Sequence, residues 1–273
     1  MNKFRRILLA IFIALIGCGL SLTSAQATSV SHEQTAIKKI AKRDLKPMGG
    51  RWSVKITRLG HSPVSVQTGN AKVGRQRAAS TIKVYIMLTI FQRAQLKQLK
   101  LTSQDQRDLK LMIHNSDNNA ANRLIKRAGG MKHVNQTIKA SGFKQTTLNR
   151  HLLDTQALHA GHDNYTSVRD LTTFLTRVYQ HRLLGKKYDQ KMLNLLKGCR
   201  NHSKLPHLVK QATVYNKTGE YPDLGVQNDS ALFKTKHGVY TIVVLAQSGH
   251  QYQQYRGMNR LGRDVVTYFN QHQ

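Results

Sequence analysis

The sequence predicts an α+β fold in which an antiparallel sheet, formed by both chain ends and flanked by helices, packs against an all-α lobe. Near the start and near the end of the 273 residues, apolar and polar residues alternate as they do in strands. Between these two regions, apolar residues recur at helical spacing. We therefore expect one sheet closed by the chain ends, plus a helical lobe.

The first elements are a helix, a hairpin and a longer helix. Apolar residues recur at helical spacing over 33–46. Segment 52–56 alternates apolar and polar residues, and a short strand pattern follows at 64–66, which is typical of a β-hairpin. Segment 80–97 is predicted to be a strong helix with buried sides.

The remaining elements are mostly helical until the pattern returns to strands. Helices are predicted at 104–114, 119–128, 131–140, 167–181 and 188–197. Strands are predicted at 212–216, 230–234 and 240–247, followed by a last helix at 251–270. No repeat or Pro-rich linker divides the chain, so a single domain, 28–273, is expected after the leader.

The first 27 residues have the pattern of an export signal. Three cations precede an almost unbroken apolar stretch over 7–20, and Ala25-Gln26-Ala27 resembles a signal cleavage site. The stretch is short for a membrane span, which needs about 20 apolar residues. We expect cleavage after Ala27 and a protein that is extracellular or associated with the cell envelope. Lipidation of Cys18, which ends a lipobox-like Leu-Ile-Gly-Cys, is an alternative.

The chain is strongly basic, with 43 Lys and Arg against 13 Asp and Glu and a formal net charge of +30. Such a chain is drawn to polyanions. Outside the cell, the expected partner is an anionic cell-wall polymer or a membrane surface, and nucleic acid is not expected. Cys18 and Cys199 are too few for a disulfide framework or a Cys-based zinc site. We expect a monomer without metal or cofactor.

Three short motifs carry the chemistry. Ser80 and Lys83 form a Ser-x-x-Lys at the start of a predicted helix, where the amine can reach the hydroxyl and the helix terminus favours an oxyanion. Ser116-Asp117-Asn118 falls in a predicted loop, and Lys217-Thr218-Gly219 ends a predicted strand. Each motif alone is explained by helix caps and turns. All three in this order are rare by chance.

This motif set resembles that of the serine β-lactamase and penicillin-binding protein superfamily. The likeness is greatest to class A β-lactamases and covers most of residues 33–270. The helix that begins at Asn118 is similar to the family's, and Arg150 and Asp163 fall where the family clamps its Ω-loop with an Arg–Asp pair. The resemblance implies a β-lactamase-like α+β fold with the active site between the sheet and the all-α lobe.

The resemblance also implies a role for each motif residue. Ser80 would be the nucleophile that forms an acyl-enzyme with a β-lactam or a D-Ala-D-Ala-like amide. Lys83 would be its base if burial and Lys217 keep the amine partly neutral, and Ser116 would pass the proton to the leaving nitrogen. The other implied roles are substrate binding by Asn118, Lys217, Thr218 and Gly219, and oxyanion binding by the backbone amides of Ser80 and Glu220.

One part of the family pattern is missing. Class A enzymes use an Ω-loop glutamate to activate the water that releases the acyl group, but segment 151–162 contains no glutamate. Asp154 is the nearest carboxylate, and its shorter, offset side chain makes it a poor and weak base. His151 and His159 could accept a proton, although loop histidines are usually plain surface residues. We therefore expect slow deacylation.

Three functions fit these observations. The first is an exported β-lactamase-type serine hydrolase with slow deacylation. The second is a penicillin-binding D-alanyl-D-alanine carboxypeptidase or an esterase-like hydrolase on the same fold, which a long-lived penicillin adduct would favour. The third is a non-catalytic cell-wall-binding protein, against which the intact motif set argues.

Overall fold

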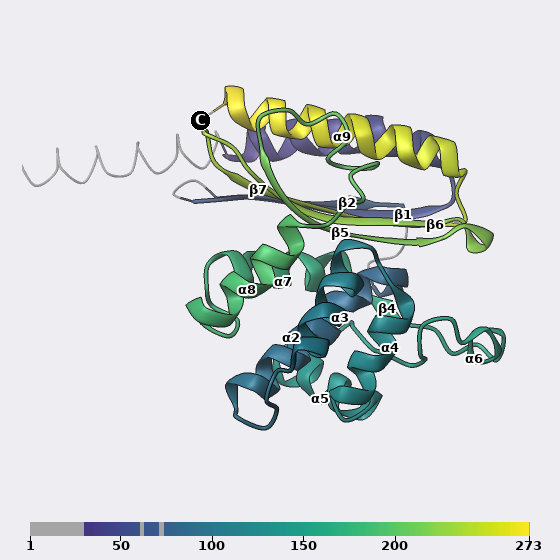
Figure 1. The fold of residues 1–273 in the computed structure, drawn as a ribbon. Coiled ribbons are helices and arrows are strands. Elements are labelled where there is room, and N and C mark those ends of the chain that lie inside the picture. Colours follow the sequence, from purple (N-terminus) through teal and green to yellow (C-terminus); the bar gives the residue numbers. More distant parts are fainter. Residues whose placement is uncertain (1–29, 61–62, 71–73, 273) are drawn as a thin grey trace, which may run out of the picture.

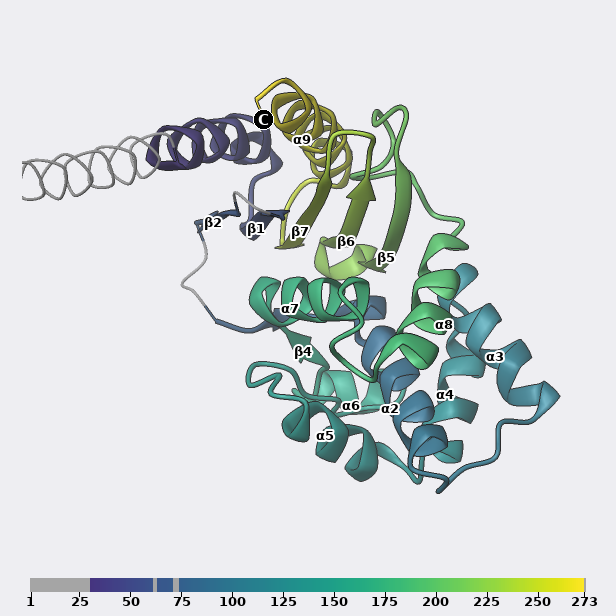
Figure 2. The ribbon, with the colours of Figure 1, turned by 90° about the vertical axis from the view of Figure 1, so that its left-hand side faces the viewer.

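A computed structural model describes residues 30–60, 63–70 and 74–272. The predicted signal at 1–27, with Cys18, lies outside these residues. Figures 1 and 2 show three layers, in which the N-terminal helix (30–45) and α9 (Gln251–Gln271) cover one face of a sheet and a helical lobe covers the other. In the part of the chain described, no helix combines the length and apolar character that a membrane crossing needs.

The sheet is antiparallel and joins the two ends of the chain, as predicted. Its strand order is β2-β1-β7-β6-β5. The early strand β1 pairs with the late strand β7 from Arg51 opposite Gln247 to Leu59 opposite Val239. The strands are β1 (Arg51–Leu59), β2 (Val64–Gly69), β5 (Thr213–Tyr221), β6 (Val226–Lys234) and β7 (Val239–Gln247).

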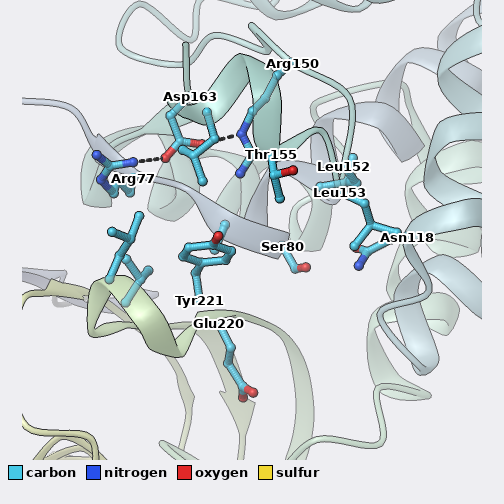
Figure 3. A pocket seen from close by; sticks show the side chains of 14 residues that line it. Arg77, Ser80, Asn118, Arg150, Leu152, Leu153, Thr155, Asp163, Glu220 and Tyr221 are labelled. Carbon is cyan, nitrogen blue, oxygen red and sulfur yellow. Dashed lines mark hydrogen bonds and ion pairs between the residues drawn. The ribbon is translucent and has the colours of Figure 1, made fainter. Parts of the chain in front are cut away.

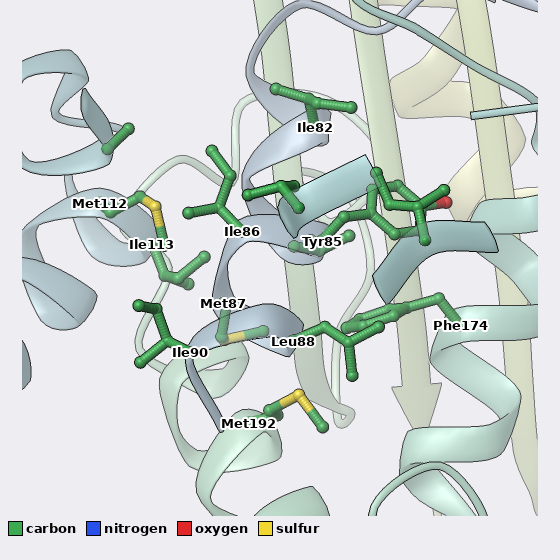
Figure 4. Packing of buried hydrophobic residues seen from close by; sticks show 14 of the residues in the cluster. Ile82, Tyr85, Ile86, Met87, Leu88, Ile90, Met112, Ile113, Phe174 and Met192 are labelled. Carbon is green, nitrogen blue, oxygen red and sulfur yellow. The ribbon is translucent and has the colours of Figure 1, made fainter. Parts of the chain in front are cut away.

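The lobe is built around α2 (Lys83–Gln95), whose residues are all buried as far as Phe91. A helix that is apolar on every side is stable only inside a protein, and Figure 4 shows side chains of the surrounding helices packed around it. The other helices are α3 (Ser103–His114), α4 (Asn118–Arg127), α5 (Met131–Ala140), α6 (Thr155–His159), α7 (Val168–Tyr179) and α8 (Lys186–Lys197). A small ladder joins β3 (Gln76–Arg77) to β4 (Tyr165–Thr166).

Two hydrophobic cores lie on opposite faces of the sheet. Strand β7 contributes to both, because successive side chains of a strand point to opposite faces. Val243 and Leu245 pack in the core shared with the lobe, while Ile242 and Val244 pack in the core beneath α9. The sheet is thereby fixed between its two helical layers, and β5 at its edge faces the lobe.

Two local predictions that concern the motifs are wrong. The helix predicted from residue 80 opens as a 3-10 turn, η2 (Ala79–Ile82), and α2 begins at Lys83. The strand predicted to end at 216 continues to Tyr221, because β5 pairs with β6 as far as Tyr221 opposite Val226. The Lys-Thr-Gly motif therefore lies inside a paired strand, where its polar side chains are buried at the site.

Candidate active site

Ser80 lies in the tight 3-10 turn η2, against which strand β5 packs closely. The preceding residue, Ala79, has a φ of 44°, a left-handed conformation that is uncommon outside glycine and often found at functional sites. A Cβ on Gly219 would lie 2.8 Å from the Ala78 carbonyl oxygen and 3.0 Å from the Ser80 nitrogen. Glycine at this position therefore allows β5 to pass directly against the turn that holds the serine.

Lys83 is fully buried, with an exposed fraction of 0%. Its Nζ lies 2.9 Å from Ser80 Oγ, 2.7 Å from Asn118 Oδ1 and 2.5 Å from the Ser116 carbonyl oxygen. Burial, followed by the nearby charge of Lys217, lowers the pKa of Lys83 to about 6. The amine is therefore mostly neutral at pH 7, as it must be to accept the proton of Ser80.

The partners of Lys83 also orient its lone pair. A neutral amine has two N–H donors and one lone pair, and the Ser116 carbonyl and Asn118 Oδ1 can only accept. These two oxygens take the two N–H bonds, so the lone pair is left for the hydroxyl of Ser80 to donate to. The serine proton thus already has its acceptor.

Ser116 lies between the two buried lysines. Its Oγ is 3.2 Å from Lys83 Nζ and accepts a hydrogen bond of 3.0 Å from Lys217 Nζ. Burial lowers the pKa of Lys217 to about 8, against the opposing effects of Cys199 and Asp229. Lys217 therefore remains mostly charged at pH 7. Ser116 is placed to relay a proton, and its φ of 59° is a second left-handed non-glycine conformation at the site.

The start of α4 positions Asn118. Asp117 caps this helix, and its carboxylate accepts a 2.6 Å hydrogen bond from the Ala120 amide. Asn118 is therefore the first helical residue, and its side chain turns toward Lys83. The Ser-Asp-Asn motif thus combines a helix cap with three contacts to the base, two from Ser116 and one from Asn118.

Most of the predicted nucleophile, relay and substrate-binding residues line one cavity of about 700 Å³. Its walls include Ser80, Ser116, Asn118, Lys217, Thr218 and Glu220. A second cavity, of about 110 Å³, adjoins Ser80 on the side of segment 150–163, which we call the Ω-loop. Figure 3 shows Leu152, Leu153 and Thr155 around this second cavity.

The predicted clamp of the Ω-loop is formed. Arg150 Nε donates to Asp163 Oδ1 at 2.9 Å, and both side chains are buried. Arg77, which sequence reasoning missed, pairs with the other carboxylate oxygen of Asp163 (Figure 3). Arg77 belongs to the short strand β3, far from the loop in sequence, and no local motif marks it.

Replacing Asp163 with alanine should lower the free energy of unfolding by about 3 kcal/mol, because Arg150 would keep a buried charge without its partner. Urea unfolding measures this difference. Asp154→Ala is the matched control, since it removes a carboxylate from the same loop and should cost only about 1 kcal/mol. Equal losses in the two variants would contradict a special role for the clamp.

The three side chains considered as alternative bases lie outside both cavities. Asp154 caps α6, and its carboxylate accepts a 2.9 Å hydrogen bond from the Ala157 amide. His151 and His159 are exposed, and neither lines a cavity beside Ser80. The structure therefore brings none of these three groups to the serine.

The loop before β5 supplies residues that sequence reasoning did not identify. Asn201 lines the larger cavity and donates a 2.8 Å hydrogen bond to Glu220 Oε1. Lys204 is fully buried and forms an ion pair with the same oxygen. Neither residue belongs to a motif, and the loop has no periodic pattern, so only the fold reveals this contact.

Solved structures with the same fold are numerous. PBP-A is 22% identical, with a TM-score of 0.75 over 85% of this chain and 96% of that chain. A β-lactamase from Sphaerobacter thermophilus is 19% identical, with a TM-score of 0.72 over 87% and 98% of the two chains. The TLA-3 extended-spectrum β-lactamase is 16% identical, with a TM-score of 0.76 over 87% and 99%.

At these identities the structural likeness establishes the fold, and it confirms the predicted β-lactamase-like α+β architecture. No curated protein matches the sequence. The model of the β-lactamase enzyme family matches residues 106–269, which include the second and third motifs. Because this match covers more than half of the chain, the chain belongs to the β-lactamase enzyme family.

Proposed function

We propose that the protein is a serine hydrolase that opens β-lactam amides through an acyl-enzyme on Ser80 and releases the acyl group slowly. The observation that carries this proposal is the buried amine of Lys83, which lies 2.9 Å from Ser80 Oγ and whose pKa is lowered to about 6. A variant of the similarly folded PBP-A has been solved as an acyl-enzyme complex with penicillin G.

Acylation follows from the contacts at the site. Ser80 Oγ attacks the lactam carbonyl while its proton moves to Lys83. Cleavage of the C–N bond requires a proton on the leaving nitrogen, and Ser116 supplies it while Lys83 returns the first proton through their 3.2 Å contact. The charge of Lys217 favours a substrate anion nearby, and backbone amides of Ser80 and Glu220 stabilise the oxyanion.

Slow release follows from the lining of the smaller cavity. Leu152, Leu153 and Leu158 present apolar side chains there. Its Asp163 carboxylate is paired through one oxygen with Arg150 and through the other with Arg77. Glu220 also borders this cavity, but its side chain turns away from the Ω-loop (Figure 3). A water molecule that enters on the Ω-loop side to attack the ester would therefore find no free carboxylate there to take its proton.

Intact-protein mass spectrometry of residues 28–273 with benzylpenicillin tests the proposal. We expect one added drug mass, because ring opening loses no atoms, and an adduct that persists for minutes or longer. Ser80→Ala is the control and should gain no mass. Absence of an adduct on the unchanged protein would refute acylation, whereas loss of the adduct within seconds would refute slow release alone.

The same carboxylate-poor cavity favours a second candidate, a D-alanyl-D-alanine carboxypeptidase. In a peptide substrate the leaving D-alanine departs and frees space for water beside the ester, whereas the leaving nitrogen of a β-lactam stays attached to the acyl group. Release of D-alanine from a peptide ending in D-Ala-D-Ala, lost in Ser80→Ala, would support this candidate. Peptide that remains intact while Ser80 is acylated by penicillin would exclude it.

Export and adhesion to an anionic wall polymer complete the proposal. The signal-like pattern of residues 1–27 and the net charge of +30 support them. Fractionation of cells expressing the full chain should place it outside the cytoplasm. Release from isolated cell walls by about 0.5 M salt would support electrostatic adhesion, because salt screens exposed charges.

A further inference from the structure

Glu220 places a negative charge on strand β5, which also carries the predicted substrate-binding residues Lys217 and Thr218. It follows Thr218 by two positions in β5, so the two side chains point to the same face of the strand. Both residues line the cavity of about 700 Å³ that also contains Ser80 and Lys217. The Glu220 side chain is 33% exposed, and Figure 3 shows it turned away from the Ω-loop residues.

Three donors hold this carboxylate in place through one of its oxygens. Oε1 accepts hydrogen bonds from Asn201 Nδ2 at 2.8 Å and from the Tyr255 hydroxyl at 3.4 Å, and it forms an ion pair with Lys204. Burial raises the pKa of Glu220, but Lys204 and these hydrogen bonds lower it overall. Glu220 is therefore ionised at pH 7. Within the described residues, Oε2 has no hydrogen-bond partner and is left for a ligand.

Both buried lysines near Glu220 already have hydrogen-bond or ion-pair partners, whereas Arg200, which lines the same cavity, is exposed. Lys204 is fully buried, and its ammonium lies 4.9 Å from the centre of the Tyr255 ring as well as against Glu220. Lys217 Nζ donates to Ser116 Oγ and to the Thr218 carbonyl. A substrate carboxylate that approaches Thr218 would thus meet a fixed anion and find the positive charge of Lys204 already paired.

We propose that Glu220 determines specificity by favouring substrates with an uncharged or cationic group beside Thr218 over substrates with a carboxylate there. This inference rests on the proposed acylation of Ser80. Like charges placed side by side in a binding site are strongly unfavourable. A ligand ammonium, in contrast, can pair with Oε2, and an ester or amide avoids the repulsion.

Three forms of one drug test the proposal: benzylpenicillin, its methyl ester and its diethylaminoethyl ester, which is a cation at pH 7. The readout is the second-order rate constant for acylation of Ser80, followed by mass spectrometry. On the unchanged protein, both esters should react at least about tenfold faster than the free acid. Glu220→Gln should raise the rate constant of the acid about tenfold relative to that of the methyl ester measured on the same variant.

Glu33→Gln is the matched control, because Glu33 is the only other glutamate in the sequence. Its carboxylate forms an ion pair with Arg58 at a distance of 2.7 Å, and it lines neither cavity. This variant should keep the ratio of acid to ester found in the unchanged protein. The double variant Glu220→Gln with Lys204→Met removes both charges of this ion pair and guards against misfolding of the single variant. An acid-to-ester ratio unaffected by either Glu220 variant would overturn the proposal.

The inference and the proposed function fail in distinguishable ways. If none of the three compounds acylates the unchanged protein, the proposed function is wrong, and affinities of Ser80→Ala for the same compounds then test the inference by calorimetry. Tighter binding of the esters than of the acid, reversed by Glu220→Gln, would support the role of Glu220. Equal affinity for all three would overturn it.

Discussion

Replacing Lys83 with methionine is expected to slow acylation of Ser80 about a thousandfold, within the range that general-base catalysis typically contributes. Methionine retains much of the buried bulk but cannot accept the serine proton. The loss should be in acylation itself, because the hydroxyl of Ser80 would still be present. Mass spectrometry with benzylpenicillin gives the rate. Lys110→Met, on the exposed side of α3, is the control and should leave it unchanged.

The pH dependence of acylation provides an independent check on the same residue. Lys83 accepts a proton only when neutral, so the rate should rise as pH increases through about 6. Lys217 attracts an anion only when charged, so the rate should fall as pH increases through about 8. A bell-shaped profile is therefore expected for benzylpenicillin. If the residual activity of Lys83→Met no longer rises with pH near 6, that rise is due to the titration of Lys83. If the rise persists in the variant, the assignment is contradicted.

The sequence was sufficient to predict these reacting groups because each lies in a short motif whose spacing reflects local geometry. Ser80 and Lys83 are one helical turn apart, and their 2.9 Å contact follows from that spacing. The sheet joining both chain ends was also predictable, since alternation of apolar residues marks strands wherever they occur. The contact of Ser116 with Lys217 requires the whole fold, and the order of the motifs indicated it through the family resemblance.

Contacts between segments without motifs were not predictable. Arg77 reaches Asp163, and Lys204 reaches Glu220, from loops or short strands whose residues have no periodic pattern. The end of β5 was misjudged for a related physical reason. Its polar residues face a buried site and not solvent, so they interrupt the alternation by which a strand is detected, although the backbone pairing with β6 continues.

The Ω-loop combines a feature that the sequence reveals with one that only the structure reveals. The absence of a glutamate was visible in the sequence, but the position where one would act was not. In the structure, the side chain of Asn122 fixes the backbone of Leu152 through two hydrogen bonds. Its Nδ2 donates to the Leu152 carbonyl oxygen at 2.8 Å, and its Oδ1 accepts from the Leu152 amide at 2.9 Å. Leu152 is 7% exposed and lines the small cavity with Ser80.

Replacing Leu152 with glutamate is therefore expected to shorten the lifetime of the penicillin adduct about a hundredfold or more, because the new carboxylate can take a proton from the attacking water. Acylation should change little, since Lys83 and Ser116 are untouched. Leucines around the cavity should raise the pKa of the introduced carboxyl. The release rate should accordingly increase with pH until that group is ionised, a dependence that the unchanged protein should lack.

Leu153→Glu is the matched control. Leu153 adjoins the same cavity, but the residue is 62% exposed, and its φ of 69° gives the backbone a different direction. A carboxylate there would be solvated and poorly aimed at the ester, so the adduct should last as long as in the unchanged protein. Faster release in Leu152→Glu alone would locate the deficiency at one side chain on an intact loop. Unchanged lifetimes in both variants would instead mean that the loop cannot place a water for attack, whatever base it carries.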